Sequence, residues 1–151
     1  MAEKEALTKA RAYCARQERC QQEVRDKLYG WGSHKDEVEA IISQLIGEGF
    51  LNEARFAEHY AVSKARQKGW GRKKIEHMLR SKGVSDQCIR FGLKAIDGTE
   101  ASADLKKAIE KKLERSKETD PRMRRQKVVN YFLRKGFGFE EIEIALSDQN
   151  A

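Results

Sequence analysis

The fold of this chain is decided by residues 75–93, IEHMLRSKGVSDQCIRFGL, because the same pattern occurs twice more along the sequence. Its framework has spacings of 4, 4, 6 and 4 residues and consists of Ile75, Leu79, Gly83, Ile89 and Leu93. The other copies, offset by 51 and 53 residues, are Val24, Leu28, Gly32, Val38 and Ile42, and Val128, Phe132, Gly136, Ile142 and Leu146. A unit of about fifty residues used three times is typical of a helical repeat protein.

Each copy predicts two helices joined by a short turn. Apolar residues four apart mark one face of a helix, and the central glycine stands where a left-handed residue ends the first helix of the pair. A further amphipathic stretch precedes each pair, for example Leu7, Ala10 and Cys14 before the first. Three helices per unit is the simplest interpretation.

The predicted fold is therefore all-α, with three tandem three-helix repeats stacked into an elongated, curved array. The repeats are expected at residues 1–51, 52–98 and 99–151. Units of this size are near the lower limit for an independent core, so each repeat should pack on its neighbour.

Local capping signals place the start of the second repeat. Asn52 is a suitable N-cap, with Leu51 and Phe56 spaced as a hydrophobic staple across it. Gly49, just before them, can end the last helix of the first repeat. The predicted helix therefore begins directly after residue 52.

Two more helix starts are visible in the sequence. Ser33 and Asp36 have the spacing of a capping box, which predicts a helix that begins after Ser33. Asp120 precedes Pro121, the only proline, and this pair is typical of an N-cap followed by the first helical residue.

The composition points to a solvated, basic protein. The net charge is +7, from 31 basic and 24 acidic residues, while only 8% of residues are aromatic. The middle repeat has 11 basic and 5 acidic residues, so it contributes +6 of this charge. A basic surface favours polyanions or acidic proteins as partners.

Several functional classes are not indicated by the sequence. No apolar run has the length of a membrane span or a signal peptide, so we expect a cytoplasmic protein. Cys14, Cys20 and Cys88 lack the paired spacing of a zinc or redox site, and we expect reduced thiols. The sequence shows no catalytic motif, and we expect no metal, no cofactor and no enzymatic activity.

The most basic segment is residues 64–82, with eight basic side chains and one acid, Glu76. Its candidate binding residues are Lys64, Arg66, Lys68, Trp70, Arg72 and Lys73. At Gly69-Trp70-Gly71 a helix is predicted to begin, and its exposed N–H groups could attract phosphate while the indole stacks on a base. The alternatives are a solvated helix face and, for Trp70, a core position, which we favour for that residue.

A second basic cluster lies in the third repeat. Its candidate binding residues are Arg115, Arg122, Arg124, Arg125, Lys127, Arg134 and Lys135. Arg124, Lys127, Arg134 and Lys135 would form a stripe on one side of a helix, opposite Val128. Glu114, Glu118 and Asp120 partly neutralise this cluster, so its interpretation as a binding surface competes evenly with a solvated face.

Specific runs in the chain closely resemble the RecX family of bacterial recombination regulators. They are GFLNEARFA at 49–57, KGWG at 68–71, KGV at 82–84, RQKV at 125–128 and FLRKGF at 132–137. The resemblance covers nearly the whole chain. In the first repeat, Trp31 precedes the turn glycine where the other two repeats have lysine.

The resemblance implies a non-enzymatic negative regulator of homologous recombination and DNA repair. Members of the family bind the RecA recombinase filament on single-stranded DNA, and they inhibit its ATPase and strand exchange. The expected partners are therefore the RecA filament and single-stranded DNA, contacted directly or through the filament, and the expected state is a monomer.

Two alternatives remain open from the residues alone. The helix pairs could act as helix-turn-helix elements that bind nucleic acid directly, although Glu141 and Glu143 would put acids on a recognition helix. The basic surface could also serve an adaptor for acidic proteins that is indifferent to DNA. Charge does not distinguish phosphate from carboxylate as the ligand.

Overall fold

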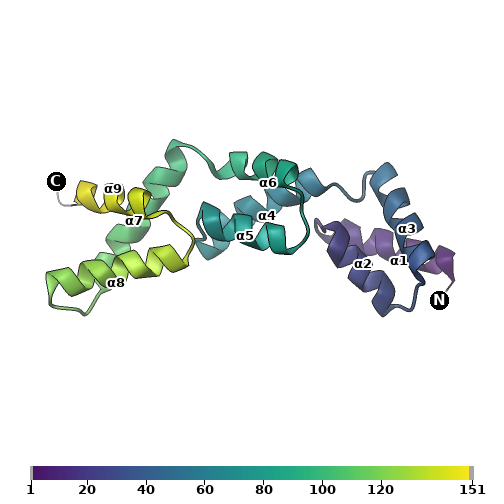
Figure 1. Cartoon of the computed structure of the whole chain (residues 1–151), viewed down its shortest axis with the longest axis horizontal. Coiled ribbons are helices and arrows are strands. Elements are labelled where there is room, and N and C mark those ends of the chain that lie inside the picture. The colour runs from purple at the N-terminus through teal and green to yellow at the C-terminus, as the bar shows by residue number, and fades with distance from the viewer. Residues whose placement is uncertain (1, 150–151) are drawn as a thin grey trace. The chain divides into compact units, whose positions relative to one another are not determined.

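The computed structural model describes residues 2–149, and over this range the chain is helical, without a strand. The elements are α1 (Glu3–Arg16), α2 (Gln21–Gly30), α3 (Lys35–Gly47), α4 (Glu53–Lys68), α5 (Arg72–Ser81), α6 (Asp86–Leu93), the 3-10 helix η1 (Lys94–Ile96), α7 (Thr99–Arg115), α8 (Pro121–Arg134) and α9 (Phe139–Gln149) (Figure 1). The predicted all-α class and its three helix triplets are confirmed. The exact repeat boundaries remain predictions.

The backbone divides into two compact units. The first contains the chain up to Tyr60 together with Met78–Gly92, and the second contains Ala61–His77 and the chain from Leu93 onward. A helix able to cross a membrane is absent from the described part of the chain, since none combines the required length with an apolar sequence.

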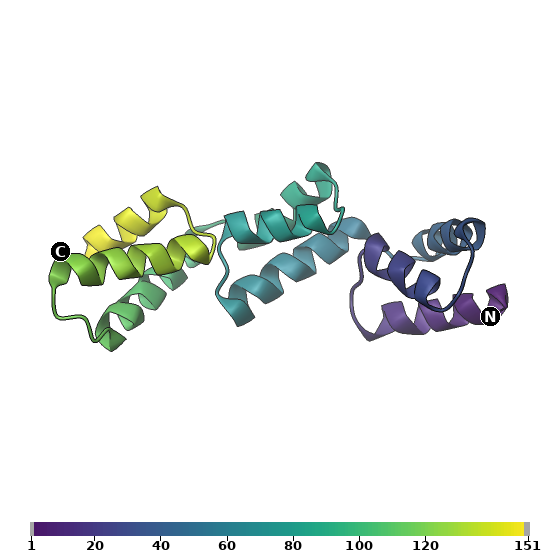
Figure 2. The ribbon, with the colours of Figure 1, turned by 60° about the horizontal axis from the view of Figure 1, so that its bottom comes forward.

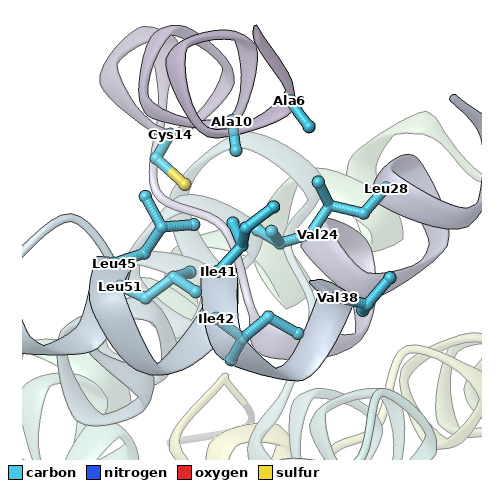
Figure 3. Close-up of a cluster of buried hydrophobic side chains, with 10 residues drawn as sticks. All are labelled: Ala6, Ala10, Cys14, Val24, Leu28, Val38, Ile41, Ile42, Leu45 and Leu51. Atoms are coloured by element: carbon cyan, nitrogen blue, oxygen red, sulfur yellow. The ribbon is translucent and has the colours of Figure 1, made fainter. Parts of the chain in front are cut away.

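One core cluster of the first unit lies between α1, α2 and α3. Small residues of α1, namely Ala6, Ala10 and Cys14, face the aliphatic side chains of the other two helices (Figure 3). These aliphatic partners include Leu28 on α2 and Leu45 on α3, both fully buried. The small side chains let the α1 backbone approach closely, and the branched residues fill the space beneath it.

The third helix triplet has its own core within the second unit. Helices α7, α8 and α9 lie side by side in both views of the ribbon (Figure 2). Their shared buried residues are Leu105, Ile109, Val128, Val129, Phe132, Ile142, Ala145 and Leu146. Residues of the repeated framework, such as Val128 and Ile142, thus form the interior, as the spacing predicts.

The turn glycine of the framework is left-handed in all three copies. Gly32, Gly83 and Gly136 have φ of +93°, +80° and +103°. In each copy the residue after the glycine donates its N–H to a carbonyl five residues earlier, at Leu28, Leu79 and Phe132. This pair of features is the Schellman motif, which explains why the framework repeats a glycine rather than a larger residue.

Two of the three predicted helix caps are confirmed. The Asn52 side chain accepts from the N–H of Arg55 at 2.9 Å, and Asp120 accepts from the N–H of Arg122 at 3.0 Å. The Ser33 cap is wrong, because α3 begins one residue later and has His34 at its N-cap without a side-chain bond. The Ser33 N–H donates instead to the Leu28 carbonyl. The buried Oγ of Ser33 has no hydrogen-bond partner among the described residues.

An unpredicted network of acids organises the start of α2. Glu23 accepts from the Cys20 N–H at 3.0 Å, and Glu53 of α4 accepts from the Gln21 N–H at 2.6 Å. Arg55 pairs with Glu18 across the predicted 51/52 boundary, so this ion pair joins the second repeat to the first. These bonds connect α2 to the beginning of α4.

Glu53 gives the stability of the fold a testable pH dependence. Burial is the largest influence on its carboxyl and raises its pKa above the ordinary 4.5, although the Gln21 N–H lowers it. A raised folded-state pKa means that ionisation favours unfolding, so its favourable contribution is complete below pH 4.5 and is lost as pH rises through the folded pKa. Glu53→Gln keeps an acceptor oxygen but cannot ionise.

We therefore expect the unfolding free energy of Glu53→Gln to increase relative to wild type as pH rises from about 4 to about 7. Urea titrations at a series of pH values measure this difference, in which the surface carboxylates common to both proteins cancel. A constant difference would show that Glu53 titrates like an exposed carboxyl, and a change in the opposite direction would show that the fold lowers its pKa.

Candidate anion-binding surface

Every basic or aromatic residue predicted as a binding residue lies in the second unit. Five of them are half-buried, namely Lys64, Trp70, Arg124, Arg125 and Lys135. The other eight are exposed, namely Arg66, Lys68, Arg72, Lys73, Arg115, Arg122, Lys127 and Arg134. They come from the end of α4, the connection to α5 and its beginning, the end of α7, the length of α8, and the residue directly after α8. Some of these positions form two groups: Lys64, Arg66 and Arg72 lie near Trp70, and Arg115, Lys127 and Arg134 line a pocket with Tyr131.

Trp70 lies in the connection between α4 and α5, where it is half-buried rather than part of a closed core. The ammonium groups of Lys74 and Lys64 lie 4.5 Å and 5.2 Å from its ring centroid. Its ring also lines a pocket of about 570 Å³ together with Ile96 and Phe137. The indole is thus a binding site for cations of its own chain, which reduces the face available for a base.

The beginning of α5 is occupied by another segment of the chain. The N–H of Gly71 donates to the Lys135 carbonyl at 2.7 Å, and the N–H of Lys73 donates to the Gly136 carbonyl at 3.0 Å. The sequence predicts that these helix-start groups are exposed and available to phosphate. The structure corrects this expectation, because the turn after α8 satisfies both groups.

Gly71, directly after Trp70, has a related role. A Cβ on Gly71 would lie 2.6 Å from the carbonyl carbon of Gly136, closer than side chains approach a backbone. Gly71 therefore permits the approach of a turn from the third helix triplet. The group that approaches Gly71 so closely is thus the backbone of the chain itself.

Several of the predicted binding cations already have partners. Arg72 contacts both carboxylate oxygens of Asp97 through Nη1, at 2.5 and 2.6 Å. Arg125 pairs with Glu143, and the Lys135 ammonium donates to the Lys68 carbonyl at 3.1 Å. All of these contacts are partly exposed, so each contributes little to stability and leaves the cations accessible.

The second group surrounds a basic pocket of about 550 Å³ beside Tyr131. The predicted Arg115, Lys127 and Arg134 line it, and Lys112 and Lys117 add two more cations. The Lys112 ammonium lies 3.9 Å from the centroid of the Tyr131 ring. Sequence reasoning missed Lys112 as a site residue, although its position three before Arg115 places both on one side of α7.

The cysteines form no disulfide among the described residues. All three are free thiols. Burial raises the pKa of Cys20 to about 11 and also raises that of Cys14, so both stay protonated at neutral pH. Within residues 2–149, no cluster of three or more histidine, cysteine or carboxylate side chains could bind a metal.

Comparison with known proteins identifies the family from all three triplets. Family models described as the first, second and third three-helix domains of RecX match residues 6–45, 52–93 and 100–146. The chain belongs to the RecX family. The match of each RecX domain contains one complete copy of the repeated framework.

Relatives and solved structures agree with this assignment. "Regulatory protein RecX" of Pelodictyon phaeoclathratiforme is 33% identical over 124 residues, covering 82% of this chain and 76% of that protein. "Regulatory protein RecX" of Bacillus velezensis is 30% identical over 143 residues, 95% of this chain and 54% of that protein. The chain thus spans about half the length of several curated RecX relatives it matches.

The fold is shared with a solved RecX. The crystal structure of RecX from Lactobacillus salivarius superposes with a TM-score of 0.87 at 25% identity, covering 98% of this chain and 96% of that one. The similarity extends over nearly all of both chains. The three-triplet arrangement is therefore a property of the RecX family and not of this sequence alone.

Proposed function

We propose that this chain is a negative regulator of homologous recombination and DNA repair that acts without catalysis. In this proposal it binds the RecA filament on single-stranded DNA in the cytoplasm, as a monomer, and inhibits its ATPase and strand exchange. The observation that supports it most strongly is the presence of all three RecX domains, in order, on one chain.

The charge distribution supports a polyanionic or acidic partner. The second unit presents exposed cations from α4, α5, α7 and α8, and the ion pairs of Arg72 and Arg125 are partly exposed. A cation in a partly exposed ion pair can exchange its carboxylate for another anion at low cost in free energy. Several weak contacts on one chain also combine through effective concentration, so modest individual contacts can give useful affinity for a filament.

Arg66 and Lys68 are the best side chains with which to test the group near Trp70. Both are exposed at the end of α4, and neither side chain has an ion pair among the described residues. Arg72, by contrast, is paired with Asp97, so its replacement would also release a carboxylate. A change confined to Arg66 and Lys68 therefore alters the surface with little effect on the fold.

We expect Arg66→Ala/Lys68→Ala to raise the concentration needed for half-inhibition of the filament ATPase by about tenfold, equivalent to about 1.4 kcal/mol. The matched control is Lys107→Ala/Lys111→Ala, which removes the same charge from exposed positions of α7. The assay measures ATP hydrolysis by RecA on single-stranded DNA at several salt concentrations. The control should inhibit nearly as well as wild type.

One result would contradict the proposed location of the contact, and another would contradict the proposed function. Undiminished inhibition by Arg66→Ala/Lys68→Ala would show that the contact lies elsewhere on the chain. A wild-type chain that leaves both the ATPase and strand exchange unchanged would overturn the proposed function itself. Sequence-specific binding to bare duplex DNA would favour a helix-turn-helix protein instead.

A further inference from the structure

The basic pocket of the third helix triplet is a concentrated positive site. Its wall is formed by the end of α7, the connection to α8, and α8 itself. The residues that line it are Lys112, Arg115, Ser116, Lys117, Glu118, Lys127, Val128, Asn130, Tyr131 and Arg134. Five cations against the single acid Glu118 give the pocket a formal charge of +4.

Two of these cations have contacts within the pocket. The Tyr131 ring meets the buried Phe132 ring edge-on, with centroids 5.0 Å apart, and this contact orients it. The Lys112 ammonium lies over the Tyr131 ring, 3.9 Å from its centroid. The Lys127 ammonium lies 3.9 Å from a carboxylate oxygen of Glu118. Lys112 and Lys127 therefore lie beside an aromatic ring and a carboxylate of the pocket, while both remain exposed to a ligand.

Helix stability explains only some of these cations. Lys112 and Arg115 are in the last turn of α7, where positive charge favours the helix dipole. Lys117 lies in the connection after α7, and Lys127 lies in the middle of α8, so the dipole accounts for neither. Like charges in one concavity repel each other, and a bound anion would remove that repulsion.

We propose that this pocket binds the sugar-phosphate backbone of single-stranded nucleic acid, with room for one nucleotide. The proposal rests on the proposed function, in which the chain binds a filament that contains single-stranded DNA. It deepens that function by assigning the pocket cations to phosphate rather than to recombinase carboxylates.

The geometry favours a strand over an acidic peptide. A phosphodiester offers two unbridged oxygens in one compact group, which several cations can contact together. The pocket volume of about 550 Å³ is within the range of small-molecule sites and can accept a nucleotide. Asn130 and Ser116 add donors and acceptors for a base or sugar, and the Tyr131 ring provides an apolar wall.

The test is direct binding of the full chain to a fluorescein-labelled oligothymidylate, measured by anisotropy without any recombinase. The pocket variant is Lys112→Ala/Arg115→Ala, and the matched control on the same helix is Lys107→Ala/Lys111→Ala. Both variants lose two charges. We expect the pocket variant to bind at least about tenfold more weakly, and its log-log salt slope to flatten by about 1.4, or about 0.7 for each lost phosphate contact.

A second measurement does not depend on the folding of a variant. An oligonucleotide that contains 5-iododeoxyuridine, irradiated on the wild-type chain, should crosslink to Tyr131, and peptide mass spectrometry can locate the adduct. Competition with thymidine monophosphate, inorganic phosphate and polyglutamate identifies the ligand. A strand should compete best, whereas superior competition by the free nucleotide would assign the pocket to a soluble ligand and overturn the proposal.

The remaining outcomes are also decisive. Equal loss of binding in the control variant, or crosslinks only outside the pocket, would show that general charge and not the pocket binds DNA. Stronger competition by polyglutamate would make the pocket a site for acidic protein segments. Because this assay lacks recombinase, its failure leaves the filament ATPase result intact, and the two proposals can fail separately.

Discussion

Gly71→Ala should destabilise the second unit by about 3 kcal/mol, one of the largest effects of any single methyl group in this chain. The added Cβ would lie 2.6 Å from the Gly136 carbonyl carbon and 2.7 Å from its oxygen. Both contacts are with backbone, which cannot rotate away. The turn must therefore shift and weaken the bonds from the N–H groups of Gly71 and Lys73 to the Lys135 and Gly136 carbonyls.

Hydrogen exchange and urea unfolding can measure this effect. In Gly71→Ala, the amides of Gly136 and Phe137 and that of Lys73 should exchange faster, and the unfolding midpoint should fall. The control is Gly138→Ala, in which the new Cβ would meet its nearest atom, a carboxylate oxygen of Glu141, at an ordinary 3.6 Å. This control should stay within about 0.5 kcal/mol of wild type. Equal stability of the two variants would mean that the turn does not pack on Gly71.

The contact between Gly71 and the turn after α8 also affects the choice between deletion and point substitution as a test of binding. Truncation after residue 98 would remove the carbonyls of Lys135 and Gly136, leaving the N–H groups of Gly71 and Lys73 without these partners. Such a chain would lose cations of the third triplet and also the packing at the beginning of α5. Point changes at exposed residues such as Arg66 and Lys68 separate these two effects, so they are preferable to deletion.

Features with local causes could be predicted from the sequence. A left-handed glycine after each framework helix follows from the positions of Gly32, Gly83 and Gly136, and the φ values confirm it. The caps at Asn52 and Asp120 likewise depend on atoms within three residues. Because the framework repeats, the three copies support one another, and the helix triplets can be located from the spacing of their apolar residues.

Features that depend on distant segments could not be predicted in the same way. The partner of Arg72 is 25 residues away at Asp97, and the carbonyls at the beginning of α5 come from the turn after α8. A run of charge such as 64–82 shows where cations are, but not which carboxylates approach them. The pocket beside Tyr131 combines α7 and α8 for the same reason, so only part of its lining was identified.

Ile142→Ala should reduce the unfolding free energy by about 3 kcal/mol, while Ile144→Ala should change it by no more than about 0.5 kcal/mol. Both residues are on α9, two positions apart, but Ile142 is 0% exposed and Ile144 is 63% exposed. The two changes delete the same atoms. Their difference therefore measures burial between α7, α8 and α9, independent of the helix propensity that they share, and urea unfolding provides the values.

The variants Ile142→Ala and Ile144→Ala also test whether binding at the basic pocket depends on the core between α7, α8 and α9. No residue of α9 lines the pocket, but α9 packs on both α7 and α8, which do. Ile144→Ala should therefore bind oligothymidylate like wild type. Ile142→Ala should bind more weakly only to the extent that its folded fraction falls, and stabilising it with a protective osmolyte should restore binding. Weak binding by fully folded Ile142→Ala would instead show that α9 sets the spacing of the cations on α7 and α8.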